Sequence, residues 1–255
     1  MRRLITAAAL LLAALSVAGS STAEAAEGAK PPKQHWSFQG VFGTFDRASL
    51  QRGFQVYKEV CAACHAVNML YYRDLMMIGY QDDDVKAIAA QAKTMDGPND
   101  AGEMFERSGR PSDKFVRPFA NDNAARASNN GALPVDLSMV VKARVGGPDY
   151  VYGLLTGYAQ PPAEVKLMEG MNYNLYFPGR QIAMASPLNA DGITYQDGTK
   201  ATVEQMARDV TTFLTWASEP TLEIRKQTGV KVMLFLLIFA GILYAAKRKV
   251  WAAVH

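Results

Sequence analysis

The 255-residue sequence contains only two cysteines and three histidines. Cys61 and Cys64 are the only thiols, so a framework of several disulfides is excluded. The histidines, His35, His65 and His255, are too few for a multi-histidine metal cage. Little of the sequence alternates between apolar and polar residues with a period of two, so few β-strands are expected. The sequence therefore predicts a fold that is mainly α with long loops.

A basic surface is also missing from the body of the chain. Of 27 basic and 24 acidic residues, the first 26 positions hold two arginines and one glutamate, and residues 230–255 hold three lysines and one arginine. Residues 27–229 are left with 21 basic and 23 acidic side chains. A net charge of −2 on this part argues against nucleic-acid binding, which uses a basic field on the folded domain. The hydrophobic fraction of 49% excludes disorder.

The N-terminus has the pattern of a secretory signal. Two arginines precede an apolar stretch, Leu4–Ala18, and small residues lead to an A-x-A cleavage pattern at 23–25. A first transmembrane helix is the alternative, but this stretch is short against the ~20 residues that a bilayer requires. Residues 1–25 are expected to be a signal peptide cleaved near Ala25 or Ala26. Its simple form favours bacterial export over an organelle presequence.

A second apolar segment lies at the C-terminus. No charged residue occurs over Val232–Ala246, and Val230 and the aliphatic stem of Lys231 extend the apolar length. The cationic cluster 247–249 follows at once and marks the cytoplasmic end by the positive-inside rule. A buried core helix is the alternative, which such a triplet at the chain end disfavours. The pattern predicts one transmembrane helix.

The two ends predict a single topology in a bacterial inner membrane. Residues 26–229 form a periplasmic domain, residues 230–248 a single-pass membrane anchor, and residues 249–255 a cytoplasmic tail. The chemistry of the protein is therefore expected outside the cytoplasm.

Apolar periodicity predicts several helices in the exported domain. One begins near Asp46 or Ser49 and shows an apolar face from Leu50 to Cys61, so it delivers the cysteines. Residues 96–131 and 170–198 are rich in Gly, Pro, Asn and Asp and are expected to be mostly loop. Further helices are expected over 84–93, 138–144 and 150–158, and from a capping box that begins at Thr202 to Ala217.

The segment Cys61-Ala62-Ala63-Cys64-His65 has the C-x-x-C-H pattern of a c-type haem attachment site. Two cysteines at this spacing can add to the two vinyl groups of one porphyrin, and His65 then lies below the ring as an iron ligand. A thioredoxin-like dithiol is disfavoured because no βαβ pattern surrounds the motif. A zinc site is disfavoured because it would need two more ligands at suitable spacing.

The second axial ligand is expected to be a methionine, because His35 is near the mature N-terminus and His255 is across the membrane. The chemistry of the residues alone favours Met184, in a turn-rich stretch with Pro and Gly, over Met168 or Met171. Met206 lies on the apolar face of a predicted helix and is expected to be core. The remaining early candidates are too near His65 in sequence to reach the opposite face easily: Met69, Met76 and Met77.

The chain resembles cytochrome c1, the haem-bearing subunit of the cytochrome bc1 complex, over most of its mature length. The resemblance is carried by ordered segments around and after the haem motif. They are Glu59-Val60, Tyr72-Arg73-Asp74-Leu75, Ala125-Arg126-Ala127, Asn129-Asn130-Gly131-Ala132-Leu133-Pro134, Ala143-Arg144, Gly146-Gly147, Asp149-Tyr150-Val151, Leu154-Leu155-Thr156-Gly157-Tyr158, Tyr176-Phe177-Pro178-Gly179, Ile182-Ala183-Met184, Asp197-Gly198-Thr199, Ala207-Arg208-Asp209-Val210 and Trp216-Ala217.

The resemblance implies a cytochrome c-type haem domain with one haem c bound covalently through Cys61 and Cys64. It implies that His65 and Met184 ligate the iron and that Arg144 lies beside a haem propionate. Positions matching the haem pocket wall are Asn129, Pro134 and Tyr150. Val135 departs from the family, which usually has a second proline there. The extra disulfide of some bacterial relatives cannot form with only two cysteines.

The resemblance also implies a role as an electron-transfer subunit of a quinol–cytochrome c oxidoreductase, with no enzymatic activity of its own. The chain would accept one electron from the Rieske iron–sulfur protein and pass it to a soluble c-type cytochrome. Cytochrome b would be its membrane partner in a dimeric complex. Two alternatives are a tethered monohaem carrier that serves a terminal oxidase and a membrane-bound dithiol oxidoreductase.

Overall fold

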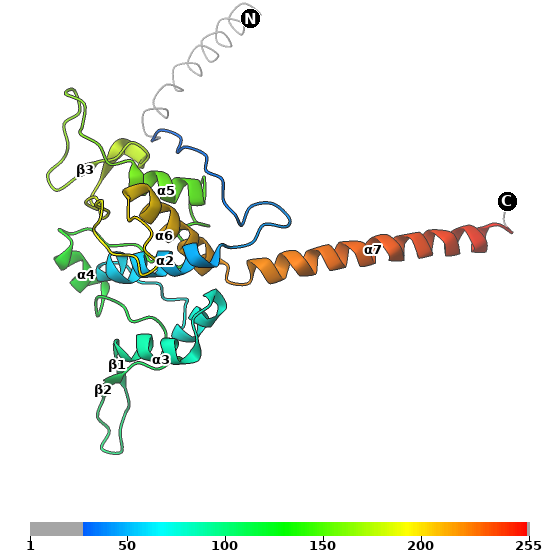
Figure 1. The fold of residues 1–255 in the computed structure, drawn as a ribbon, viewed down its shortest axis with the longest axis horizontal. Helices are drawn as coiled ribbons and strands as arrows, with labels where there is room; N and C mark the ends of the chain where they lie inside the picture. The colour runs from blue at the N-terminus through cyan, green and yellow to red at the C-terminus, as the bar shows by residue number, and fades with distance from the viewer. Residues whose placement is uncertain (1–27, 254–255) are drawn as a thin grey trace, which may run out of the picture.

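Helices and long loops make up most of the structure, a computed structural model that describes residues 28–253 (Figure 1). The predicted signal peptide and His255 lie outside these residues. The helices are α2 (Arg47–Glu59), α3 (Asp82–Ala90), α4 (Asp122–Ser128), α5 (Pro148–Thr156), α6 (Val203–Ser218) and α7 (Leu222–Trp251), with 3-10 turns η2 (Cys61–Ala63), η3 (Tyr72–Ile78) and η4 (Pro178–Arg180). The prediction of a mainly α fold with one C-terminal apolar helix is confirmed.

Two small antiparallel sheets complete the described secondary structure. Strands β1 (Lys93–Asp96) and β2 (Phe105–Ser108) pair with Lys93 opposite Ser108, and β3 (Asn172–Tyr173) pairs with β4 (Gln181–Ile182). The first hairpin projects from the body of the domain (Figure 1). Ion pairs of Arg107 with Asp96 and Asp113 stabilise the base of this hairpin. Helix α4 begins where the Asn121 side chain accepts a hydrogen bond from the Ala124 amide at 2.9 Å. The prediction that residues 96–131 are mostly loop therefore missed β2 and α4.

Packing of α2 against α6 forms the centre of the core (Figure 1). Gly53 permits this close approach, because a Cβ at that position would lie 2.0 Å from the Asp209 carbonyl oxygen. Phe54 and Tyr57 of α2 pack on Phe213 of α6, with ring centroids 5.7 and 5.6 Å apart. All three aromatic residues are buried. The apolar face predicted for the helix before the cysteines is thus the contact surface with α6.

A buried ion pair fixes the register of α2 on α6. The fully buried Asp209 carboxylate accepts hydrogen bonds from Arg52 Nε at 2.8 Å, Ser49 Oγ at 2.7 Å and Gln205 Nε2 at 2.9 Å. Burial acts to lower the pKa of Arg52, but the hydrogen bonds to Asp209 and Asp197 outweigh it and raise that pKa. The guanidinium therefore stays charged, and both carboxylate oxygens of Asp209 accept hydrogen bonds.

Helices α2 and α6 begin at the cap residues that the sequence predicted. Asp46 caps α2 by accepting from the Ala48 and Ser49 amides, as predicted. Thr202 Oγ1 accepts from the Gln205 amide at 3.1 Å, so α6 also starts where expected. The predicted capping box is only half formed, because the Gln205 side chain binds Asp209 instead of returning to Thr202.

The bounds of the other predicted helices differ more from those in the structure. Helix α3 lies two to three residues earlier than 84–93, and α5 begins at Pro148 rather than at residue 150. No helix forms over 138–144, which is a series of turns. The Ser138 hydroxyl, expected near a helix start, instead accepts from the Met69 amide at 3.1 Å.

Helix α7 projects far from the domain (Figure 1) and has the length and composition of a membrane span. An 18-residue window of this 30-residue helix has a mean hydropathy of 2.2 and is not buried inside the protein. Leu222 is its only buried residue and docks the helix start on the core. The helix extends beyond the predicted anchor, 230–248, at both ends.

Replacement of Asp209 by alanine tests the α2–α6 ion pair. The change leaves the Arg52 guanidinium largely buried without its main partner, and loss of one member of a buried pair costs about 3–5 kcal/mol. We expect a decrease of this size in the free energy of unfolding, measured by guanidinium denaturation of the detergent-solubilised protein. Lys86→Ala, which removes an exposed ion pair on α3, is the matched control and should change stability little. Equal stability of the two variants would show that the ion pair does not hold the helices together.

Candidate haem site

The C-x-x-C-H motif forms a tight turn at the end of α2. The helix ends at Glu59, and η2 (Cys61–Ala63) continues the chain without a break. The amides of Cys64 and His65 both donate to the Cys61 carbonyl, at 3.1 and 2.8 Å. Both cysteines are free thiols, with Cys61 half-buried and Cys64 exposed. The turn therefore brings two thiols and one imidazole together at the surface of the domain.

A hydrogen bond sets the orientation of the His65 ring. Its Nδ1 lies 2.7 Å from the Val135 carbonyl oxygen, which can only accept, so Nδ1 carries the proton. Nε2 then has a free lone pair and is the nitrogen available to a metal. Burial lowers the pKa of His65 below its ordinary value, and the opposing effect of the Val135 carbonyl is smaller. The neutral imidazole, which is the ligating form, is favoured.

The segment that supplies this carbonyl is fastened to the residues after His65. Besides the bond to His65, three hydrogen bonds of 2.8–3.1 Å join the two segments. Residues 135–138 thus lie along residues 65–69 and hold the histidine in place. The three bonds run from the Leu137 amide to the Ala66 carbonyl, from the Asn68 amide to Asp136 Oδ2 and from the Met69 amide to Ser138 Oγ.

Val135, where the resemblance implies a second proline, contacts His65 through its backbone carbonyl and not through its side chain. The side chain is 46% exposed, and the preceding Pro134 is half-buried. Because a valine and a proline present the same backbone carbonyl, the substitution leaves the bond to His65 possible. Asn129 lies upstream at the end of α4, where its Nδ2 donates to the Ala125 carbonyl at 2.7 Å.

Met184 is held on a different part of the domain, just after β4. The Tyr158 hydroxyl donates to the Met184 carbonyl at 3.0 Å, and burial raises the pKa of Tyr158, which keeps this donor protonated. Tyr158 follows α5, and the fully buried Asn174 ties the β3 segment to α5 through the Leu154 carbonyl at 2.8 Å. The end of α5 therefore positions the methionine.

The other methionines differ from Met184 in their surroundings. Met206 is fully buried in α6, as predicted for a core residue. Met168 is 61% exposed and Met171 is half-buried. Met69, Met76 and Met77 are exposed. Within residues 28–253, hydrogen bonds join Met184 to Tyr158 and His65 to Val135, and none joins the two predicted ligands to each other.

Comparison with known proteins identifies the family. The sequence model of the Cytochrome C1 family matches residues 36–254. Cytochrome c1 of Rhodospirillum rubrum is 46% identical over 260 residues, covering 95% of this chain and 96% of that protein. The mitochondrial cytochrome c1 haem protein of Schizosaccharomyces pombe is 50% identical over 222 residues, covering 87% of this chain and 72% of that protein. The chain belongs to the cytochrome c1 family.

A longer relative shows the same region in another context. The "Cytochrome b/c1" protein of Bradyrhizobium diazoefficiens is 48% identical over 275 residues, which include 99% of this chain. The chain spans only 39% of the length of that relative. The resemblance seen in the sequence is thus confirmed.

Members of the cytochrome c1 family carry one covalently bound haem c, and the residues here fit that group. Two free thiols and an imidazole with a free Nε2 lie together in one turn. Beside them, Leu133 and Val135 expose apolar side chains, 36% and 46%, although their segment is held firmly against the domain. A porphyrin face would cover such surface and remove it from water.

Arg144 and Tyr150 are the polar residues that the resemblance assigns to the haem site. Arg144 is exposed, and no carboxylate among residues 28–253 forms an ion pair with it. Burial raises the pKa of Tyr150, and the neighbouring Arg144 guanidinium opposes that rise. A guanidinium without a protein carboxylate is chemically suited to pair with a haem propionate, the role that the resemblance implies for it.

The described residues also bear on the zinc and dithiol alternatives. No group of three or more His, Cys, Asp or Glu residues within the described chain is arranged to hold a metal ion. Burial, with a smaller contribution from Cys64, raises the pKa of Cys61 to about 12. Reactive dithiols need a lowered thiol pKa. The raised pKa therefore disfavours Cys61 as a reactive thiol.

Proposed function

We propose that this chain is the haem subunit through which electrons leave a quinol–cytochrome c oxidoreductase. It accepts one electron from the Rieske iron–sulfur protein and passes it to a soluble c-type cytochrome. The observation that carries the proposal is a family match over 36–254 together with a C-x-x-C-H turn whose histidine is preset by Val135. The chain itself breaks no bond of the quinol.

The residues of the site have distinct roles in this proposal. Cys61 and Cys64 would hold the haem through thioethers, and His65 Nε2 and the Met184 sulfur would bind its iron. When bound, haem c supplies reversible one-electron chemistry at its iron. The Val135 carbonyl keeps the proton on His65 Nδ1, which prevents the ring from turning its free lone pair away. The Tyr158 bond holds the Met184 backbone in the same way.

The remaining predicted residues define the rim of the pocket. Arg144 would pair with a haem propionate, whose carboxylate would otherwise be unpaired at the edge of an apolar site. The half-buried Asn129 and Pro134 and the buried Tyr150 line the wall. These residues exclude water and thereby limit the reorganisation that accompanies a change of one charge.

The chain is placed in the membrane by its two ends. Residues 1–25 are removed during export, residues 26–229 lie in the periplasm, residues 230–248 cross the bacterial inner membrane and residues 249–255 remain in the cytoplasm. The unburied apolar surface of α7 supports this anchor. The haem domain then faces both the Rieske protein and the soluble carrier on the periplasmic side.

Partnership with cytochrome b is supported by the names of relatives. One bacterial relative is called "Cytochrome b/c1", and a Candida albicans relative, 46% identical over 98% of this chain, is called "Cytochrome b-c1 complex catalytic subunit, mitochondrial". We propose that this chain assembles with cytochrome b and the Rieske protein in a dimeric complex.

Met184→Lys tests the proposed axial ligand. A thioether stabilises ferrous iron, so replacing it with an amine or water should lower the midpoint potential by roughly a few hundred millivolts while the haem stays attached. Since 59 mV is a factor of ten for one electron, this drop would stop reduction by the Rieske protein. Redox titration of the purified variant measures it. Met168→Lys, at an exposed loop position, is the matched control and should leave the potential unchanged. An unchanged potential in Met184→Lys would assign the ligand to another residue.

Purification of the tagged full-length chain from its native membranes tests the assembly. We expect a b-type haem subunit and an iron–sulfur protein to accompany it, and a pulse of quinol to reduce the c haem. Removal of the iron–sulfur protein should abolish that reduction, because the electron then has no route to the c haem. Co-purification with a terminal oxidase, without a b-type subunit of a quinol oxidoreductase, would instead identify a tethered carrier.

A further inference from the structure

The loop between Phe38 and Phe45 exposes apolar side chains at its tip. Both ends of the loop are buried, and the ring centroids of Phe38 and Phe45 are 5.1 Å apart. The tip residues Val41 and Phe42 are 62% and 83% exposed. A firmly rooted loop that presents its largest apolar side chain outward is suited to contact an apolar phase.

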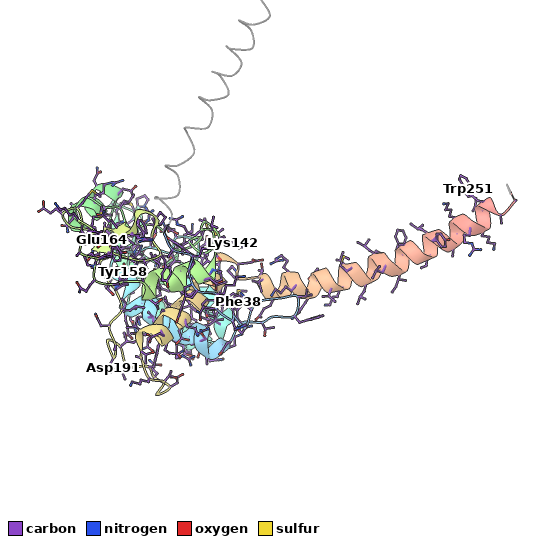
Figure 2. All side chains as sticks on the ribbon, turned by 90° about the horizontal axis from the view of Figure 1, so that it is seen from above. Phe38, Lys142, Tyr158, Glu164, Asp191 and Trp251 are labelled. Carbon is purple, nitrogen blue, oxygen red and sulfur yellow. The ribbon has the colours of Figure 1, made fainter. Side chains whose placement is uncertain are left out.

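The start of α7 holds this loop in place. Lys226 Nζ donates to the Phe38 and Gly43 carbonyls, at 2.6 and 3.1 Å. The Phe45 amide donates to Glu223 Oε1 at 2.7 Å. Figure 2 shows Phe38 on the side of the domain from which α7 emerges. The loop therefore moves with the first turns of the anchor and has a fixed height along it.

The position of this loop along α7 places it at the surface of the bilayer. The charge-free stretch Val232–Ala246 is about 22 Å long at 1.5 Å per residue, shorter than a hydrocarbon core of about 30 Å. The missing length of about 7.5 Å corresponds to about five residues shared between the two ends, which puts the outer edge of the hydrocarbon near Gly229, with the Lys231 ammonium extending outward to it. Lys226 is then about 5 Å further out, among the lipid headgroups. The loop bound to Lys226 lies at the same depth.

A cleft between the loop tip and α7 has the lining expected of a phospholipid site. It has a volume of about 430 Å³ and is lined on its apolar side by Val41, Phe42 and Val230. Lys226 and Lys231 supply positive charge, and the Glu223 carboxylate that also lines the cleft is already paired with Arg47 and the Phe45 amide. Lys226 uses only two of its three donors in the loop bonds. Apolar surface toward the acyl chains and ammonium groups at the phosphates complement a phospholipid.

We propose that Val41 and Phe42 insert into the outer leaflet of the membrane and form a second contact of the haem domain with lipid. The cleft beside them takes a phospholipid headgroup, with its phosphate between Lys226 and Lys231. This contact prevents the domain from tilting about the single helix α7. It requires α7 to cross the membrane but does not depend on any electron-transfer partner, so it can fail without affecting the proposed function.

A nitroxide label on Val41→Cys in the full-length haem-loaded protein tests this insertion. The protein is placed alone in nanodiscs of phosphatidylglycerol and phosphatidylcholine, and collisions of the label with oxygen and with a water-soluble nickel chelate are measured by power saturation. Oxygen concentrates in lipid, whereas the chelate stays in water. We expect the oxygen-to-nickel collision ratio at Val41→Cys to be several-fold that at Val145→Cys, a control at a 98% exposed position.

A second variant shows whether Phe42 drives the insertion. Phe42→Asp in the Val41→Cys background places a charge at the tip and should return the collision ratio to that of the Val145→Cys control. Equal ratios at Val41→Cys and Val145→Cys in the nanodisc would overturn the proposal. It would also be overturned if the label at Val41→Cys became shielded only when the cytochrome b subunit was added, because the tip would then contact protein rather than lipid.

Discussion

The hydrogen bond from His65 Nδ1 to the Val135 carbonyl is the contact on which the site depends. It determines which ring nitrogen is free, and it exists only because residues 135–138 are fastened along residues 65–69. Helix α2 in turn delivers His65, and the buried Asp209 pairs α2 with α6. Helix α6 also packs on α5, whose end positions Met184 through Tyr158. One helix therefore supports both proposed iron ligands.

Local patterns in the sequence predicted the parts of the structure that local interactions form. The start of α2 at Asp46, the start of α6 at Thr202, the apolar helix α7 and the C-x-x-C-H turn all follow from neighbouring residues. The histidine's partner could not be predicted in this way. Val135 is 70 positions from His65, and the contacting group is a backbone carbonyl that every residue possesses.

Tertiary contacts also explain the errors. Ser138 has the chemistry of a helix cap, but its hydroxyl satisfies the Met69 amide, and a run of turns replaces the predicted helix. Gln205 completes a capping-box pattern, but its side chain is used by the buried Asp209. In both cases a distant or buried group outcompeted the local partner. The hydrogen-bond partners of Ser138 and Gln205 were therefore predicted wrongly. Each has the side chain of a local helix cap, but in the fold that side chain binds another group.

His65 and Met184 are proposed to hold the haem iron between a nitrogen and a sulfur. X-ray absorption at the iron edge of the full-length protein measures the first coordination shell directly. We expect one sulfur alongside the nitrogens of the porphyrin and His65 in the native protein, in both oxidation states. A shell of nitrogen or oxygen alone would exclude Met184 as an iron ligand.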